Sequence, residues 1–243
     1  MQIIKLDATD STNRYLKVLA LENKLPDFTF VTTKDQRQGR GQMGSKWQSE
    51  PGKNLTFSVL KKFNNQPAID NFTINMVVSL SIIDVLKTHA IEGLAIKWPN
   101  DILSGSSKIA GILIENILKG PMTEYSIIGV GLNVNQTDFG DLTRASSLKT
   151  ITGHNFELDT LLQELVEAFQ RRFGWMERNK TLTIRNTYEE ALFRKDKPST
   201  FEDQEGNRFV GIIRGVSSEG KLCIESETDP IRYFDLKEVS LLY

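Results

Sequence analysis

Hydrophobic and polar residues over the first 190 positions follow two periods, one typical of strands and one typical of helices. Strands are expected at 3–8, 28–34, 54–61, 94–98, 108–117 and 125–135. Helices are expected at 9–24, 67–90, 157–179 and 184–192. Asp10 or Ser11 can cap the first helix. Within 54–61, Leu55, Phe57 and Val59 share one face, which predicts a half-buried strand.

The pattern changes after residue 195, where short strands separated by turn residues replace the helices. Strands are expected at 208–216, 221–226 and 231–236. Closely spaced strands of this kind predict a small β-barrel. We therefore divide the chain into residues 1–195 and 196–243, with the boundary near Pro198.

Composition narrows the class of protein. The 30 Lys and Arg residues nearly balance the 31 Asp and Glu residues, so the net charge of -1 offers no general field for nucleic acid. The single Cys223 excludes an internal disulfide and a multi-cysteine zinc site. The first residues lack the features of a signal peptide, and no apolar run approaches the roughly 18 residues of a membrane span. We expect a soluble, cytoplasmic protein.

Three glycines in QRQGRGQMGSKW have the spacing Gly39-x-Gly41-x-x-Gly44. A dinucleotide-binding loop of this spacing opens directly into a helix, whereas here a Pro-Gly turn and a strand follow. A protein kinase would also need H-R-D and D-F-G motifs, which are absent. The glycines instead allow backbone N–H groups to approach an anion, with Arg40 and Trp47 beside them. A mobile surface loop is the alternative, and the loop alone does not decide between the two.

Further motifs favour an anionic ligand. Lys108 begins the apolar stretch KIAGILIEN, where a lysine is costly unless it meets an anion. Gly111, like two later glycines, lies inside an expected strand, which marks a place where something packs against the backbone. The stretches KWPNDI and DSTN each have a simple explanation, a tight turn and a helix cap. Together the motifs suit a carboxylic acid that condenses with ATP, because that step brings two anions together and needs cations, usually Mg²⁺, and a lid against water.

In this order, DSTN, QRQGRGQMGSKW, KWPNDI, KIAGILIE and GVGLNVN resemble the catalytic core of the biotin protein ligases, over about residues 5 to 135. The resemblance implies an α+β fold with a central mixed β-sheet and flanking helices, like that of class II aminoacyl-tRNA synthetases, and a small SH3-like β-barrel at the C-terminus. It also implies a reaction. Biotin and MgATP would give biotinyl-5′-AMP, and the biotin would pass to a lysine of the carrier domain of a biotin-dependent carboxylase.

The resemblance further implies roles for individual residues. Lys108 and Arg40 would be catalytic. Biotin would contact Ser11, Thr12, Asn13, Gln36, Gly39, Arg40, Gly41, Gln42, Trp47, Lys108 and Gly111. The nucleotide would contact Arg40, Trp47, Lys97, Asn100, Lys108 and Asn133, and Asp101 would hold Mg²⁺.

This sequence departs from the family in the glycine loop. Many members carry a basic residue where Gln42 stands, and some also at Met43 and Ser45, so the adenylate would be held less tightly here. Regulatory members begin with a DNA-binding domain, whereas this sequence begins at the catalytic core, so we expect a ligase that is not a repressor. Exposed strand edges in this fold could pair two copies into a homodimer. A lipoate or octanoate ligase and a non-catalytic biotin-binding module are the alternative functions.

Overall fold

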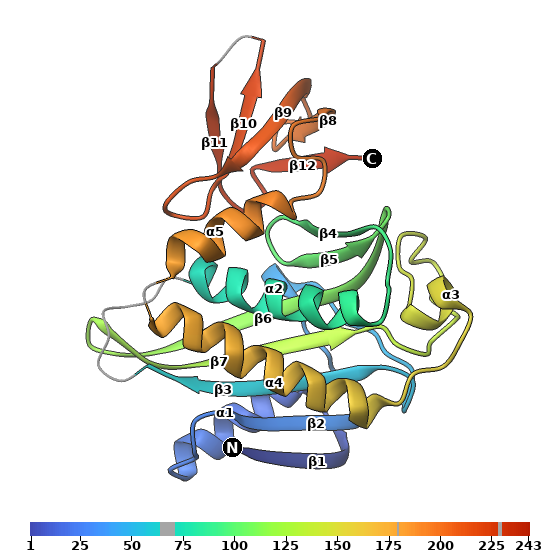
Figure 1. Ribbon diagram of the computed structural model, residues 1–243, viewed down its shortest axis with the longest axis vertical. Helices are drawn as coiled ribbons and strands as arrows, with labels where there is room; N and C mark the ends of the chain where they lie inside the picture. Colours follow the sequence, from blue (N-terminus) through green and yellow to red (C-terminus); the bar gives the residue numbers. More distant parts are fainter. Residues whose placement is uncertain (64–70, 179, 228–229) are drawn as a thin grey trace.

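The computed structural model describes residues 1–63, 71–178, 180–227 and 230–243, which form a seven-stranded and a five-stranded sheet with helices around them (Figure 1). The strands of the first sheet are β1 (Gln2–Thr9), β2 (Thr29–Gln36), β3 (Leu55–Lys62), β4 (Leu94–Lys97), β5 (Asp101–Ser104), β6 (Ser107–Lys119) and β7 (Met122–Leu132). The strands of the second sheet are β8 (Pro198–Asp203), β9 (Arg208–Val216), β10 (Leu222–Ser226), β11 (Arg232–Phe234) and β12 (Val239–Leu242). The helices are α1 (Thr12–Glu22), α2 (Asn71–Thr88), α3 (Leu148–Thr152), α4 (Leu158–Glu177) and α5 (Thr181–Glu190), with a 3-10 turn η1 (Gln42–Gly44).

The first sheet is mixed. Its order is β1-β2-β3-β7-β6-β5-β4, in which β1 and β2 are parallel and the other neighbours are antiparallel. This confirms the expected central mixed sheet with flanking helices. The outer side of β4 is covered by the chain after α5, because Ile96 exchanges backbone hydrogen bonds with Ala191 and Phe193.

Helices cover both faces of the first sheet, α2 and α4 on one face and α1 on part of the other. The prediction that residues 54–61 form a half-buried strand is therefore wrong, since β3 is buried on both faces. Leu60 packs against Leu16 of α1, and Phe57 faces the larger core on the opposite side. Beyond α1, the same face of the sheet is left for the site described below.

The expected helices are present. Ser11, not Asp10, caps α1, because its hydroxyl accepts a hydrogen bond from the N–H of Arg14. Residues 67–70 of the second expected helix and residue 179 of the third lie outside the described residues. The pattern missed β5, β8, β12 and α3, which are all six residues or shorter. None of the described helices is long and apolar enough to cross a membrane.

The second sheet has the order β11-β10-β9-β8-β12, and all its described strand pairs are antiparallel. Within the described residues β11 and β12 do not pair, so the sheet is open and the barrel is not confirmed. Trp98 Nε1 donates to the carbonyl of Gly220 at 2.9 Å. Apolar residues of this sheet belong to the same buried cluster as those of α2 and α4. The two sheets therefore share one core.

Candidate active site

A cavity of about 320 Å³ lies on the face of the first sheet that α1 leaves open. Its floor is formed by β3, β6 and β7, and the loop between β2 and β3 covers it. Of the residues expected at the site, it is lined by Ser11, Thr12, Asn13, Gln36, Arg40, Gly41, Gln42, Trp47, Asn100, Asp101, Lys108 and Gly111. The fold thus brings together motifs that are up to 100 residues apart in the sequence.

One end of the cavity is a buried network of hydroxyl and amide groups. Ser58 Oγ on β3 lies 2.7 Å from Thr12 Oγ1 and 2.6 Å from Asn13 Oδ1. The N–H and hydroxyl of Thr12 both donate to Gln36 Oε1, at 2.9 and 3.2 Å. Because this oxygen is engaged, the amide nitrogen of Gln36 remains as a donor. The DSTN motif therefore both caps α1 and places polar groups at the cavity.

Asn13 is held from two sides. Its Nδ2 donates to Glu115 Oε2 on β6 at 2.8 Å, and a carboxylate can only accept, so this contact fixes which way the amide points. Its Oδ1 lies directly against Gly129 on β7, where even a methyl group would overlap it. Contacts within the protein therefore fix the position and orientation of the Asn13 amide without a ligand.

The opposite end is charged. Lys108 Nζ lies 2.6 Å from Asp101 Oδ1. Asp101 is therefore an anion of the kind that we expected beside this lysine. A β-bulge on β6 places Ile109 and Ala110 in the core one after the other, and Lys108 consequently faces the same side as Gly111. Without the extra residue, positions three apart on a strand would face opposite sides.

The glycine loop is closed by its own backbone. Gly41 N–H donates to the carbonyl of Ser45 at 2.8 Å, and Trp47 N–H donates to that of Gly39 at 3.0 Å. The prediction that the loop's N–H groups stand ready for an anion is wrong for these two, because the loop uses them to close itself. The charged groups it offers are the exposed side chains of Arg40 and Lys46.

Trp47 lies over the floor of the cavity. A methyl group on Gly131 would overlap its indole, and one on Gly111 would come within 3.2 Å of Cζ3. Lys108 Nζ lies 5.7 Å from the ring centroid. The indole Nε1 is buried and has no hydrogen-bond partner among the described residues. Gly111 and Gly131 thus make room for the indole ring of Trp47. The N–H of this ring is a hydrogen-bond donor without a partner among the described residues.

Three expected residues lie outside the main cavity. Gly39 lines an adjoining groove. Lys97 lines a cleft of about 240 Å³ against the second sheet, with its Nζ 5.0 Å from the ring centroid of Tyr243. Asn133 is buried directly after the end of β7, where its Nδ2 donates to the carbonyl of Ser146 at 3.0 Å. Asn100, although it lines the cavity, donates through Nδ2 to the carbonyl of Ile112 at 2.7 Å.

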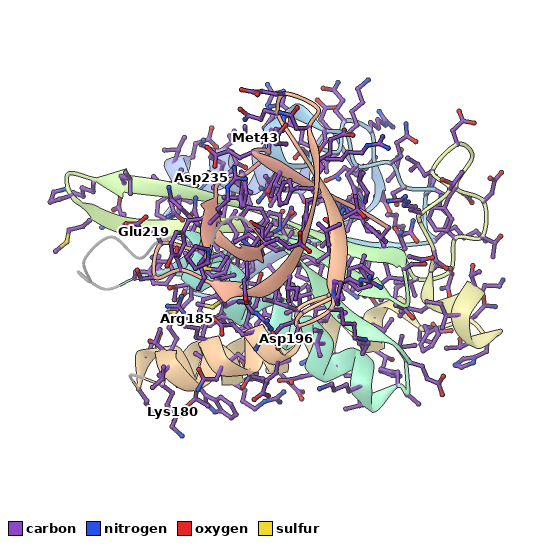
Figure 2. All side chains as sticks on the ribbon, turned by 90° about the horizontal axis from the view of Figure 1, so that it is seen from above. Met43, Lys180, Arg185, Asp196, Glu219 and Asp235 are labelled. Carbon is purple, nitrogen blue, oxygen red and sulfur yellow. The ribbon has the colours of Figure 1, made fainter. Side chains whose placement is uncertain are left out.

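The sequence missed three residues of the site. Ser58 and Glu115 both bond to Asn13. Each is a polar residue within an apolar strand, on the face of the sheet that α1 leaves open, and this is the sequence signal that could have identified them. Lys237 comes from the segment before β12, lines the cavity, and donates to the carbonyl of Met43 at 3.4 Å. Seen from above, Met43 lies beside the segment that carries Asp235 (Figure 2). No local pattern could have joined positions 43 and 237.

Comparisons with known proteins identify the family of this chain. Residues 6–133, more than half of the chain, match the model of the biotin/lipoate A/B protein ligase family. A biotin–[acetyl-CoA-carboxylase] ligase of Paracoccus denitrificans is 29% identical over 90% of this chain and 92% of its own length. The bifunctional ligase/repressor BirA of Bacillus subtilis is 27% identical over 92% of this chain and 69% of its own length.

Solved structures give the same result for the whole length of the chain. A biotin protein ligase from Aquifex aeolicus, in complex with biotin and ATP, superposes with a TM-score of 0.82 at 25% identity, covering 99% of this chain and 98% of that one. The match includes the second sheet as well as the first. The chain belongs to the biotin/lipoate A/B protein ligase family.

Proposed function

We propose that this protein is an ATP-dependent biotin ligase, which activates biotin as biotinyl-5′-AMP and transfers it to a lysine of a biotin carrier domain. The observation that carries the proposal is the division of one cavity into a neutral polar end and a cationic end. Biotin has the same division, with a ureido ring at one end and a carboxylate at the other. Relatives named as biotin ligases, and a similar structure that holds biotin and ATP, support this choice.

At the polar end, the amide groups of Asn13 and Gln36 suit a ureido ring. Asn13 Oδ1, fixed by Glu115 and Ser58, is an acceptor for a ring N–H. The amide nitrogen of Gln36 is a donor for the ring carbonyl, because its oxygen is bound by Thr12. A dithiolane ring offers neither group, and this argues against lipoate as the substrate. We also assign Ser11, Gly39, Gly41, Gln42 and Gly111 to the biotin side.

At the charged end, Lys108 and Arg40 reduce the repulsion between the biotin carboxylate and the α-phosphate of ATP. A carboxylate oxygen bonds to the α-phosphorus, and the bond from that phosphorus to the pyrophosphate oxygen breaks. In the second step the amine nitrogen of the carrier lysine bonds to the biotinyl carbon. The bond from that carbon to the AMP oxygen breaks, AMP leaves with the electron pair, and the nitrogen loses a proton to water.

Asp101 is the residue that would hold Mg²⁺. Mg²⁺ usually binds through one or two carboxylates together with substrate phosphates. Among the described residues no group of three or more His, Cys, Asp or Glu side chains could hold a metal. Asp101 is the one carboxylate in the described lining of the cavity, and its Oδ1 lies 2.6 Å from Lys108 Nζ, so an ion would share this carboxylate with the lysine and with substrate phosphates. Lys97, Asn100, Asn133 and Trp47 are assigned to the nucleotide.

The remaining assignments extend the proposal. We assign residues 1–195 to a catalytic domain and 196–243 to a small domain related to SH3-like barrels. The near-neutral net charge supports a ligase that does not bind DNA. The outer edge of β1, which has β2 as its only partner strand among the described residues, suits pairing with a second copy. A cytoplasmic location agrees with a carboxylase carrier as partner.

The test is to mix the protein with biotin, MgATP and a biotin carrier domain, and to measure the mass of the carrier. We expect the mass to rise by one biotinyl group, with release of pyrophosphate. A non-catalytic biotin-binding module would bind biotin and give neither product. A lipoate or octanoate ligase would modify a lipoyl domain in parallel reactions and leave the biotin carrier unchanged.

A further inference from the structure

The side-chain amide of Asn13 has two ends of nearly the same size, an oxygen that accepts hydrogen bonds and an NH2 group that donates them. Asn13 is only 5% exposed, so turning the amide round would change the chemistry of the cavity without changing its shape. Gly129 packs directly against the amide and has no side chain that could distinguish the two ends. Packing alone therefore leaves both orientations open.

Ser58 does not choose between the orientations either. Its Oγ lies 2.6 Å from Asn13 Oδ1 and 2.7 Å from Thr12 Oγ1. A hydroxyl donates one hydrogen and also accepts. If the amide were turned round, Ser58 would accept from Nδ2 and turn its hydrogen toward Thr12. The hydroxyl of Ser58 can thus satisfy either orientation.

Glu115 accepts only one orientation. Its Oε2 accepts a hydrogen bond from Asn13 Nδ2 at 2.8 Å, and a carboxylate has no hydrogen to give in return. With the amide turned round, two oxygens would face each other, one of them charged. The other carboxylate oxygen, Oε1, lies 4.0 Å from Lys17 Nζ on α1. Among the described partners of this amide, Glu115 is therefore the one that decides its orientation.

Glu115 acts from outside the cavity. The described lining of the cavity includes Asn13 but not Glu115, which lines the adjoining groove. A ligand in the cavity therefore meets the amide of Asn13 and not the carboxylate behind it. The influence of Glu115 on that ligand is limited to whether the amide accepts or donates.

We propose that Glu115 is a positioning residue that makes the site select a ring N–H over a ring oxygen in a ligand of the same shape. The inference rests on the proposed function, in which Asn13 Oδ1 accepts from the ureido ring. With Glu115 in place, a ring N–H bonds to Oδ1, whereas a ring oxygen is repelled by it. A site built to bond a particular group strongly rejects analogues that lack it. The selected class is therefore cyclic ureas, and the rejected class is cyclic carbamates.

The experiment compares biotin with two cyclic carbamate analogues, in each of which one ring N–H is replaced by oxygen. Calorimetric titration gives the Kd of each ligand for the wild type and for Glu115→Gln. Glutamine has the same shape as glutamate but both accepts and donates, so it permits both orientations of the amide. The Glu115 side chain is 39% exposed, so the fold should tolerate this change. Glu124→Gln is the control, because it removes the same charge at an exposed carboxylate on the neighbouring strand β7.

We expect the wild type to bind biotin at least about a hundredfold more tightly than the carbamate whose oxygen faces Asn13. In Glu115→Gln this ratio should fall about tenfold, because the turned amide donates from Nδ2 to the ring oxygen. Glu124→Gln should keep the wild-type ratio. A purely structural role of Glu115 would weaken the binding of both ligands equally and would leave the ratio unchanged.

The double variant Asn13→Asp/Glu115→Gln gives an independent check. It has the same net charge as the wild type, and the carboxylate at position 13 has an oxygen at both ends, so its orientation no longer matters. The glutamine amide at position 115 can donate to it. Both ligands should bind more weakly because a charge is now buried, but the ratio between them should return at least to the wild-type value.

An unchanged ratio in Glu115→Gln would overturn the inference, and so would a ratio that stays low in the double variant. The failure of the proposed function looks different. In that case the wild-type protein itself would bind neither biotin nor the carbamates and would show no biotin-dependent pyrophosphate exchange.

Discussion

The two ends of the cavity are built in different ways. At the polar end, Thr12, Asn13 and Ser58 are at most 5% exposed and are bonded to one another. At the charged end, Arg40 and Lys46 stand exposed on a loop that is bonded mainly to itself. Binding to the first end costs little ordering, whereas the exposed side chains at the second end lose more conformational freedom when they bind a ligand. The polar end is therefore preformed, as is the charge of Lys108, whereas the charge that the loop carries is positioned during binding.

The largest effect is expected for Lys108, which lies on β6 and not on the glycine loop. Lys108→Ala should slow biotin-dependent pyrophosphate exchange about a hundredfold or more, because one preorganised cation typically contributes about 3–4 kcal/mol to the transition state. Lys46→Ala removes an exposed cation of the loop, and its effect should be smaller. Equal losses in the two variants would remove the distinction between fixed and assembled charge.

Ser58→Ala tests the preformed end. Ser58 has one hydroxyl hydrogen for its two contacts, with Thr12 Oγ1 and Asn13 Oδ1, and its loss leaves a buried acceptor unsatisfied, which typically costs about 1–3 kcal/mol. We expect the Kd for biotin to rise about tenfold, measured by calorimetric titration, with little change in the KM for ATP. Ser79→Ala is the matched control, because Ser79 is equally buried and its hydroxyl has no partner among the described residues. Similar affinities for the two variants would contradict a binding role for the network.

The two floor glycines compare the ends directly. Alanine at Gly129 would overlap Asn13, which is held from both sides, and alanine at Gly131 would overlap the ring of Trp47, which belongs to the loop. Overpacking at a site that cannot yield costs about 1–3 kcal/mol. Gly129→Ala should therefore lower the free energy of unfolding in urea by that amount. Gly131→Ala should lower it by less and should instead displace Trp47, seen as a shift in its fluorescence. The opposite order would show that the loop is the more rigid part.

The smallest effect is expected far from both ends. Burial raises the pKa of the Cys223 thiol on β10. The thiolate is the reactive form, so alkylation at neutral pH should be slower than for an exposed cysteine and should speed up as the pH rises. Cys223→Ser should leave pyrophosphate exchange unchanged. A clear loss of exchange would mean that the second sheet influences the cavity through its core.

Much of the site was readable from the sequence because its motifs are local. The Ser-Thr-Asn cluster, the glycine loop and Lys108 were each recognisable where they stand, and all line one cavity. The amide orientation of Asn13 was not readable, since it depends on a glutamate 102 positions away. The partner of Lys108 was missed for another reason, because a β-bulge, which leaves little trace in an apolar strand, decides which way the lysine faces.

The junction of the two sheets has a consequence for folding. Phe201 and Ile213 of the second sheet lie in the same apolar cluster as Phe57 and Ile128 of the first. Tyr188 of α5 is fully buried in that cluster as well. Neither half can melt without uncovering the other, so heat should unfold the protein in one cooperative transition. If a protease cut near Pro198 and released the second sheet, the remaining fragment would expose its apolar residues at the junction to water and would tend to associate through them.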